Sequence, residues 1–148
     1  MANYADVINR VVAVVVDTII LWAIMLVLSV PLGLSGMAFS MVDVQAAAQM
    51  MSMLAMSAVY IILGAALWII YFTYFEGTTG QTLGKKLANI KVVTEKGKQP
   101  DYTEAFIRTV LRFVDGILLY LIGLIVILSS EKKQRIGDMA ARTIVVKA

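Results

Sequence analysis

The chain has 148 residues, of which 60% are hydrophobic, and its formal net charge is +3. This composition excludes an ordinary soluble domain and is typical of an integral membrane protein with three or four hydrophobic segments. Cysteine and histidine are absent, which excludes disulfides and metal sites built on thiolate or imidazole and leaves only carboxylate oxygens as ligands. We predict no resident metal and no cofactor. The positive charge fits loops that face anionic lipid better than it fits nucleic-acid binding.

Two long apolar stretches predict two helices in the first half of the chain. The first helix is expected over residues 6–34, with fraying at Pro31 and Gly33. We predict that this helix is retained, because its apolar run exceeds the ~7–15 residues of a signal peptide and contains Asp17. The second helix, expected over residues 50–75, carries no charge, and its small residues would let another helix approach closely.

A polar stretch with five lysines follows, at residues 76–102. Its IKVV segment and the TIVV segment of the tail predict two short strands that could pair. GTTGQTLGKK does not fit the Walker A phosphate loop, because Gly80 and Gly84 are separated by three residues where that motif has four. We predict instead a cytoplasmic turn, in which glycines allow a tight backbone and lysines meet lipid headgroups.

A third hydrophobic helical segment is predicted over residues 103–129. Arg108, Arg112 and Asp115 follow one another at spacings of four and three, which places them on one helical face. We expect a kink or a break at Asp115 and the glycine after it. The predicted fold is therefore a single all-α membrane domain over residues 1–148, with three hydrophobic helical segments and a short cytoplasmic β-element.

The positions of lysine and arginine predict the orientation in the membrane. The loop at residues 35–49 has neither, whereas residues 76–102 hold five lysines. By the positive-inside rule, the first loop lies outside and the second in the cytoplasm. We therefore predict a multi-pass membrane protein with a cytoplasmic N-terminus. Three full crossings would place the basic tail outside, whereas a re-entrant third segment would leave it in the cytoplasm; we favour the second arrangement, and both stay open.

Two arginine–aspartate pairs lie within the apolar stretches. Arg10 precedes Asp17 by seven positions, and Arg108 precedes Asp115 by the same number, a rise of about 10 Å along one helical face. Charges at membrane depth usually face other helices or a polar cavity. Asp17 and Asp115 are thus candidate ion- or proton-binding residues, with Arg10, Arg108 and Arg112 as charge partners. The alternatives are a structural cluster that locks helix packing, or a surplus arginine that recruits an anionic group.

An internal repeat is a further hypothesis. An offset of 98 residues aligns Arg10 with Arg108 and Asp17 with Asp115, together with several apolar positions. Apolar matches are common among membrane segments, so duplication and coincidence both stay open. Duplication would relate the first and third helices by an axis along the membrane normal.

The tail adds one more candidate, Asp138, which follows a glycine among basic residues. We predict that Asp138 caps a short helix or accepts hydrogen bonds from Arg135 or Arg142. Nucleophile–base pairs, carboxylate dyads at a defined spacing and nucleotide fingerprints are absent from the sequence, so we predict that the protein is not an enzyme.

The charged residues and three sequence segments together resemble the RDD family of bacterial membrane proteins. The segments are GQTLGKKLANIKVV, the R-x3-R of the third helix and IGDMAARTIVV, and the resemblance covers nearly the whole chain. The family is named for one arginine and two aspartates. The resemblance implies that Arg10 and Asp17 are the first two of these three residues. Asp138 matches the second aspartate, with Asp115 as the alternative. The histidine usual before this aspartate is Gly137 here, so any role of that histidine in proton handling is missing.

The resemblance implies a protein of the bacterial inner (plasma) membrane. It also implies transport of ions or small ligands, with sodium/proton exchange among the activities proposed for the family. We predict a small membrane protein that transports cations or protons, with Na⁺ and a proton competing for Asp17 or Asp115. Three helices barely enclose a pathway, so transport implies a homo-oligomer. The alternative is a non-transporting scaffold or accessory subunit whose Arg/Asp cluster locks helix packing. The expected partners are the lipid bilayer, further copies of the chain, and Na⁺ or a proton, but not nucleic acid.

Overall fold

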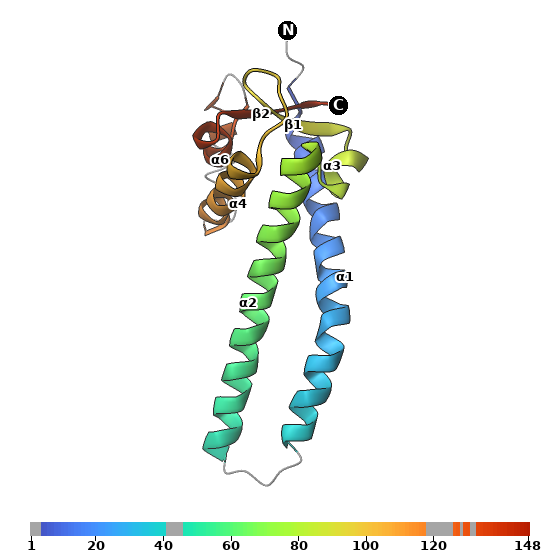
Figure 1. The fold of residues 1–148 in the computed structure, drawn as a ribbon, viewed down its shortest axis with the longest axis vertical. Coiled ribbons are helices and arrows are strands. Elements are labelled where there is room, and N and C mark those ends of the chain that lie inside the picture. The colour runs from blue at the N-terminus through green and yellow to red at the C-terminus, as the bar shows by residue number, and fades with distance from the viewer. Residues whose placement is uncertain (1–3, 41–45, 118–125, 128, 131–132) are drawn as a thin grey trace. The chain divides into compact units, whose positions relative to one another are not determined.

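The computed structural model is mostly helical, with one small two-stranded sheet (Figure 1). It describes residues 4–40, 46–117, 126–127, 129–130 and 133–148, without the side chains of residues 32–47, 49 and 113–117. The chain forms two compact units. We call residues 1–18 and 69–148 the charged unit, and residues 19–68 the apolar unit.

Two long helices supply most of the secondary structure. Helix α1 covers Val7–Ser40 and helix α2 covers Ala46–Thr79. Each contains a stretch long and apolar enough to cross a bilayer, Val7–Pro31 in α1 and Met50–Thr79 in α2. Only 17% of the apolar window in the first stretch is buried, and none of that in the second, which is unlike the core helices of a soluble protein. The two apolar helices predicted first along the chain are confirmed.

Helix α1 is longer than the sequence suggested. We expected its end near Pro31 and Gly33, but the helix continues through both and ends at Ser40. A proline removes one backbone donor and disturbs one turn. Membrane helices tolerate this disturbance because the neighbouring backbone adjusts and satisfies the freed groups.

The large side chains of the apolar unit are mostly exposed. They include Trp22, Leu26, Ile61 and Ile62. An apolar groove of about 410 Å³ lies between the α1 and α2 segments of this unit, beside Gly64. An exposed apolar surface of this extent is what a bilayer would cover.

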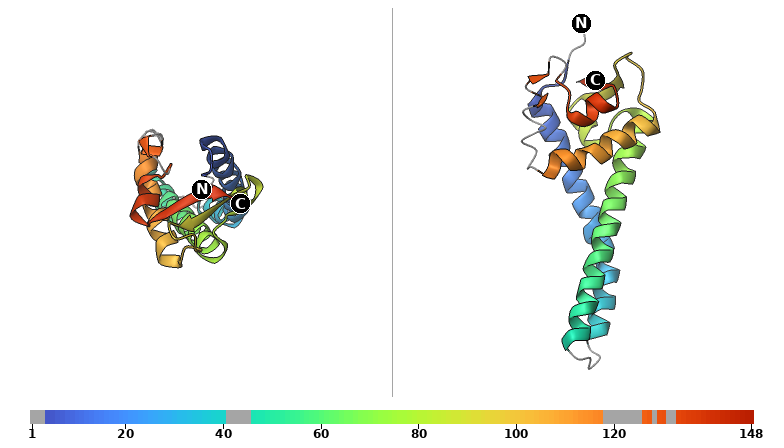
Figure 2. Two further views of the ribbon diagram at one scale, coloured as in Figure 1. Left: turned by 90° about the horizontal axis from the view of Figure 1, so that it is seen from above. Right: turned by 90° about the vertical axis from the view of Figure 1, so that its left-hand side faces the viewer.

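In its described residues, the charged unit combines the first turns of α1 and the last turns of α2 with five short elements. These are α3 (Leu83–Leu87), β1 (Ile90–Thr94), α4 (Tyr102–Ile117), α6 (Ile136–Ala140) and β2 (Thr143–Lys147). In the right-hand view of Figure 2, α4 lies across the parts of α1 and α2 that belong to this unit.

The two strands pair as the sequence predicted. β1 and β2 are antiparallel, with a register that runs from Ile90 opposite Lys147 to Thr94 opposite Thr143. The small apolar core lies under this pair and consists of Ala5, Ala13, Ile90, Val92 and Val145. Because the strands lie far apart in the sequence, their pairing joins the tail to the segment after α2.

The third hydrophobic segment is described only in part. Helix α4 continues through Asp115 and the next glycine to Ile117, so the break predicted there is absent. A glycine inside a helix costs only about 1 kcal/mol, and neighbouring turns readily offset that cost. Residues 118–125 lie outside the described residues. A third membrane segment and the side of the tail therefore stay predictions.

Candidate functional site

Asp17 is held by three hydrogen bonds from uncharged donors. Its side chain is buried, with 1% exposure. Tyr71 Oη donates to Oδ1 at 2.8 Å, Thr82 Oγ1 to Oδ2 at 2.5 Å, and the backbone N–H of Gly84 to Oδ1 at 2.8 Å. Thr82 is also the N-cap of α3. Asp17 thus fixes α3 against α1 and α2.

Gly84 permits this close contact between α3 and α1. A Cβ atom at this position would clash with the backbone oxygen of Ala13 and lie 2.8 Å from the Asp17 carboxyl carbon. The glycine therefore lets the Gly84 N–H reach the carboxylate. The prediction that glycines of the GTTGQTLGKK segment allow a tight backbone is confirmed. Gly80, at φ +70°, supports it as well.

Glu76, near the end of α2, lies at the centre of a buried ionic cluster. Its carboxylate is fully buried and pairs with Lys85 Nζ at 2.6 Å, Arg108 Nε at 3.0 Å and Arg112 Nη2 at 3.0 Å. The guanidinium of Arg112 also lies 4.1 Å from the ring centre of Phe72. Glu76 is not among the residues predicted from the sequence, although an acidic residue directly after the uncharged stretch at residues 50–75 is a signal that could have indicated it.

Lys85 is not on the lipid-facing surface that we predicted for it. Only 7% of the residue is exposed, because its position on α3 turns the side chain toward Glu76. Burial lowers the pKa of Lys85 to about 8; Glu76 opposes this effect, while Arg108 and Arg112 add to it. The adjacent Lys86 is exposed, so contact with headgroups stays a prediction for that residue.

Asp138 joins three helices. Its Oδ1 lies 2.6 Å from Arg108 Nη1 on α4, and its Oδ2 lies 3.3 Å from Arg10 Nη1 on α1. Oδ2 also accepts the backbone N–H of Arg135 at 3.1 Å, which confirms the predicted cap of a short helix, α6. Burial alone would raise the pKa of Asp138, but Arg108, Arg10 and Arg135 together hold it below its usual value.

Arg108 connects the two carboxylate centres. It pairs with both Glu76 and Asp138, and it donates a further hydrogen bond to Thr143 Oγ1 in β2. The network therefore ties α2, α4 and α6 to the sheet. Replacing one charge would leave its partners buried with less compensation.

Four of the predicted charged residues gather in one network, namely Arg10, Arg108, Arg112 and Asp138, whereas Asp17 is held outside it by uncharged donors. Their partners differ from those expected. Arg10 pairs with Asp138 rather than Asp17, and Arg108 pairs with Glu76 and Asp138. A spacing of about 10 Å along one helix is too long for a direct ion pair. The side chain of Asp115 lies outside the described residues, so its pairing and its candidate role stay predictions.

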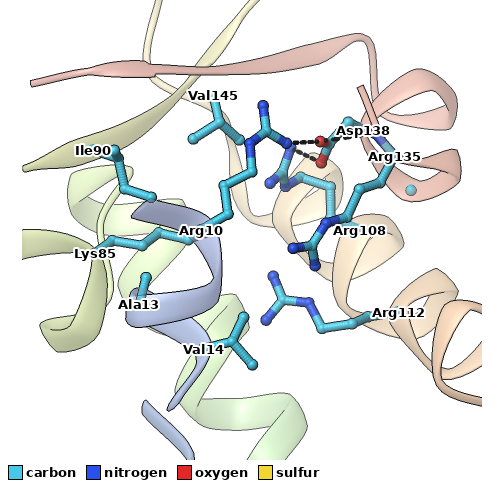
Figure 3. A pocket seen from close by; sticks show the side chains of 11 residues that line it. Arg10, Ala13, Val14, Lys85, Ile90, Arg108, Arg112, Arg135, Asp138 and Val145 are labelled. Carbon is cyan, nitrogen blue, oxygen red and sulfur yellow. Dashed lines mark hydrogen bonds and ion pairs between the residues drawn. The ribbon is translucent and has the colours of Figure 1, made fainter. Parts of the chain in front are cut away.

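A small cavity opens beside Arg10 in the charged unit (Figure 3). Its volume is about 30 Å³. The guanidinium ends of several arginines turn toward it in the figure. Five cationic residues line it together with one carboxylate, that of Asp138. The five are Arg10, Lys85, Arg108, Arg112 and Arg135.

Arg10 is incompletely paired within this cavity. The residue is 4% exposed and its Nη1 reaches Asp138, yet Nε and Nη2 have no hydrogen-bond partner. Within the described ranges, groups of three acidic, histidine or cysteine side chains that could hold a metal ion are also absent. The chemistry available at the cavity is thus mainly that of guanidinium and ammonium donors.

The RDD family profile matches residues 4–142. The chain belongs to the RDD family. The match includes Arg10, Asp17 and Asp138 and confirms the resemblance drawn from the sequence. The RDD match and the two apolar helices together indicate a membrane-type protein.

Two relatives of this RDD protein are both described as proline-rich antigen homologues. They come from Mycobacterium tuberculosis, strains CDC 1551 / Oshkosh and ATCC 25618 / H37Rv, and each is 30% identical over 84 residues. The match covers 56% of this chain but 35% of each relative, so the chain spans about a third of their length. No solved structure matches this RDD protein.

Proposed function

We propose that this RDD protein is a membrane-embedded scaffold or accessory subunit without catalytic activity. In this proposal the buried charged network holds the charged unit in one arrangement at the bilayer surface. The unit could then serve as a fixed platform for lipid or for a partner. The family membership and the two apolar helices support the membrane part of the proposal.

The surroundings of Asp17 carry the proposal. A carboxylate that exchanges Na⁺ and a proton needs oxygen lone pairs open to the ion and acceptor oxygens around it. Asp17 instead accepts three hydrogen bonds at 2.5–2.8 Å, one of them from the backbone N–H of Gly84, which cannot act as a cation ligand. Such a carboxylate is suited to fixing helices in place.

Sodium/proton exchange in a homo-oligomer is the second candidate. The observation in its favour is that Asp17 is buried within a helix segment long enough to cross a bilayer. Ionisable residues at such positions often belong to ion pathways. Exchange would require Asp17 to leave its hydrogen bonds during each cycle and would place the Asp115 carboxylate in the same pathway.

The substitution Asp17→Asn separates the two candidates. The asparagine NH2 group would face the donors of Thr82 or Gly84, so a scaffold should lose about 1–3 kcal/mol of stability for each unsatisfied group. Asp6→Asn is the matched control, because Asp6 is exposed and its ion pairs with Lys133 and Lys147 lie at the surface.

Both variants and the wild type are purified, checked for unfolding midpoint and oligomer size, and placed in liposomes under Na⁺ and proton gradients. The scaffold proposal expects no flux from the wild type and a lower midpoint for Asp17→Asn alone. Wild-type flux that disappears in a normally assembled Asp17→Asn protein would replace the scaffold proposal with exchange at Asp17.

A further inference from the structure

We propose that the cavity beside Arg10 binds a phosphate-type oxyanion, supplied by a lipid headgroup or by soluble phosphate. This site is separate from the role of Asp17, and it would exist in a scaffold as well as in a transporter. Its cationic lining and the two nitrogens of Arg10 without partners are the observations that point to an anion.

Two nitrogens of the Arg10 guanidinium are buried without a hydrogen-bond partner. Arg10 is 4% exposed, so water cannot freely satisfy its donors, and its one hydrogen bond to Asp138 is long at 3.3 Å. Buried donors in native proteins almost always have a partner, and a charged donor without one is costly. Nε and Nη2 lie on one edge of the planar guanidinium, and such an edge binds two oxygens of one phosphate group.

The rest of the lining fits the same ligand. Arg10 comes from α1, Arg108 and Arg112 from α4, and Arg135 from the start of α6. A phosphate group presents several oxygens in different directions and can accept from donors on all three elements, whereas the two oxygens of a carboxylate lie in one plane. The carboxylate of Asp138 does not oppose this binding strongly, because Arg108, Arg10 and the Arg135 N–H already engage its oxygens.

The size of the cavity limits the chemical class of its ligand. A water molecule needs about 10–15 Å³ of cavity volume. The cavity beside Arg10, at about 30 Å³, therefore holds roughly two or three waters. The oxygen face of one phosphate group is of that order, whereas a nucleotide base or a sugar is too large. A lipid phosphate and inorganic phosphate share this recognition chemistry and differ in what is attached to it.

The substitution Arg10→Lys tests the site without removing charge. Lysine keeps a cation beside Asp138 but lacks the planar edge formed by Nε and Nη2. Arg142→Lys is the matched control, because Arg142 is an exposed arginine of the same unit that does not line the cavity. Equal unfolding midpoints without added anion would show that all three proteins fold.

Two arms distinguish the sources of the phosphate group. In the first, inorganic phosphate is titrated at constant ionic strength into the protein in a neutral detergent, and the unfolding midpoint is followed. In the second, the protein is taken from nanodiscs of phosphatidylcholine with or without phosphatidylglycerol, and retained lipids are counted by native mass spectrometry.

We expect wild type and Arg142→Lys to bind in at least one arm, and Arg10→Lys to bind about tenfold or more weakly in the same arm. Binding in the phosphate arm alone assigns a soluble oxyanion, and binding in the lipid arm alone assigns a headgroup. Equal responses of all three proteins, or no response in either arm, would overturn the proposal. If Arg10→Lys fails to fold, Arg135→Lys takes its place, with the same expected loss.

Discussion

Glu76 is a buried carboxylate that forms ion pairs with three cations. It is fully buried and compensates three cations from two other elements, Lys85 on α3 and the arginines at 108 and 112 on α4. A buried ion pair is a weak source of net stability, because desolvation offsets most of the attraction. Removing only one partner of the pair is nevertheless costly, because the charges that remain stay buried.

The substitution Glu76→Gln should therefore destabilise the protein by about 3–5 kcal/mol. Glutamine keeps the volume and one acceptor oxygen but removes the charge that three cations share. Denaturant unfolding of the purified protein in mixed micelles measures the change. Glu95→Gln is the control, since Glu95 is exposed and its contact to Gln134 Nε2 is long at 3.4 Å. A Glu76→Gln protein as stable as this control would contradict the central role of Glu76.

The residues of the family motif were found from sequence for a physical reason. A charge inside a long apolar run is unusual, so Arg10 and Asp17 could be singled out without any alignment. Glu76 escaped notice because it lies where the apolar run gives way to a polar stretch, and charges are common there. Its burial depends on α3 and α4, which fold back over the end of α2.

Among the elements, the short helix α6 depends most on a single side chain. Five residues are too few to form a helix alone, and Asp138 supplies both its N-terminal cap and its ion pairs to α1 and α4. The sequence predicted the cap because Asp138 follows a glycine and lies among basic residues. It did not predict that arginines from two distant helices meet the same carboxylate.

The pH dependence of stability should report on Asp138. The pKa of Asp138 in the folded protein lies below its usual value. The contribution of Asp138 to folding stability is therefore fully present above the unfolded pKa of about 3.9, and it is lost as the pH falls through the folded pKa. We expect wild type to exceed Asp138→Asn by about 3–5 kcal/mol at pH 7. That difference should persist to about pH 5 and shrink below about pH 4.

Circular dichroism of thermal unfolding across this pH range measures the difference. Asp101→Asn is a matched control, because Asp101 accepts the Glu104 N–H at the start of α4 and asparagine caps a helix about as well as aspartate. A difference between wild type and Asp138→Asn that stays constant down to pH 3 would show that this carboxylate does not titrate as described.

For the whole molecule, the central prediction is its orientation in the bilayer. The charged unit holds the lysine-rich segment, whereas the apolar unit exposes large apolar side chains suited to lipid. From the positive-inside rule, we predict that the charged unit lies in the cytoplasm. Because the chain has no cysteine, single cysteines can be introduced without removing native ones.

We expect Lys96→Cys to react with a membrane-impermeant maleimide only in inverted vesicles, and Asp43→Cys only in intact cells. Ile61→Cys should stay unreactive in both. Ile61 is exposed on the protein surface within a stretch long enough to span the membrane, so its side chain should contact lipid and not water. Labelling after detergent solubilisation is the control for reactivity. The opposite labelling pattern would reverse the orientation, and reactivity of Ile61→Cys in vesicles would argue against α2 as a membrane span.

The sequence by itself determined the two apolar helices, the strand pair, the cap of α6 and the family. These features follow from local signals, namely apolar runs, β-branched segments and motif residues, which need little knowledge of the surroundings. Only the tertiary structure decided the partners of the charges. Arg10 and Asp138 are 128 positions apart, and Arg108 and Glu76 are 32 apart. Which buried charges meet depends on how the elements pack, and the energy of each pair is set by burial that no local pattern reveals.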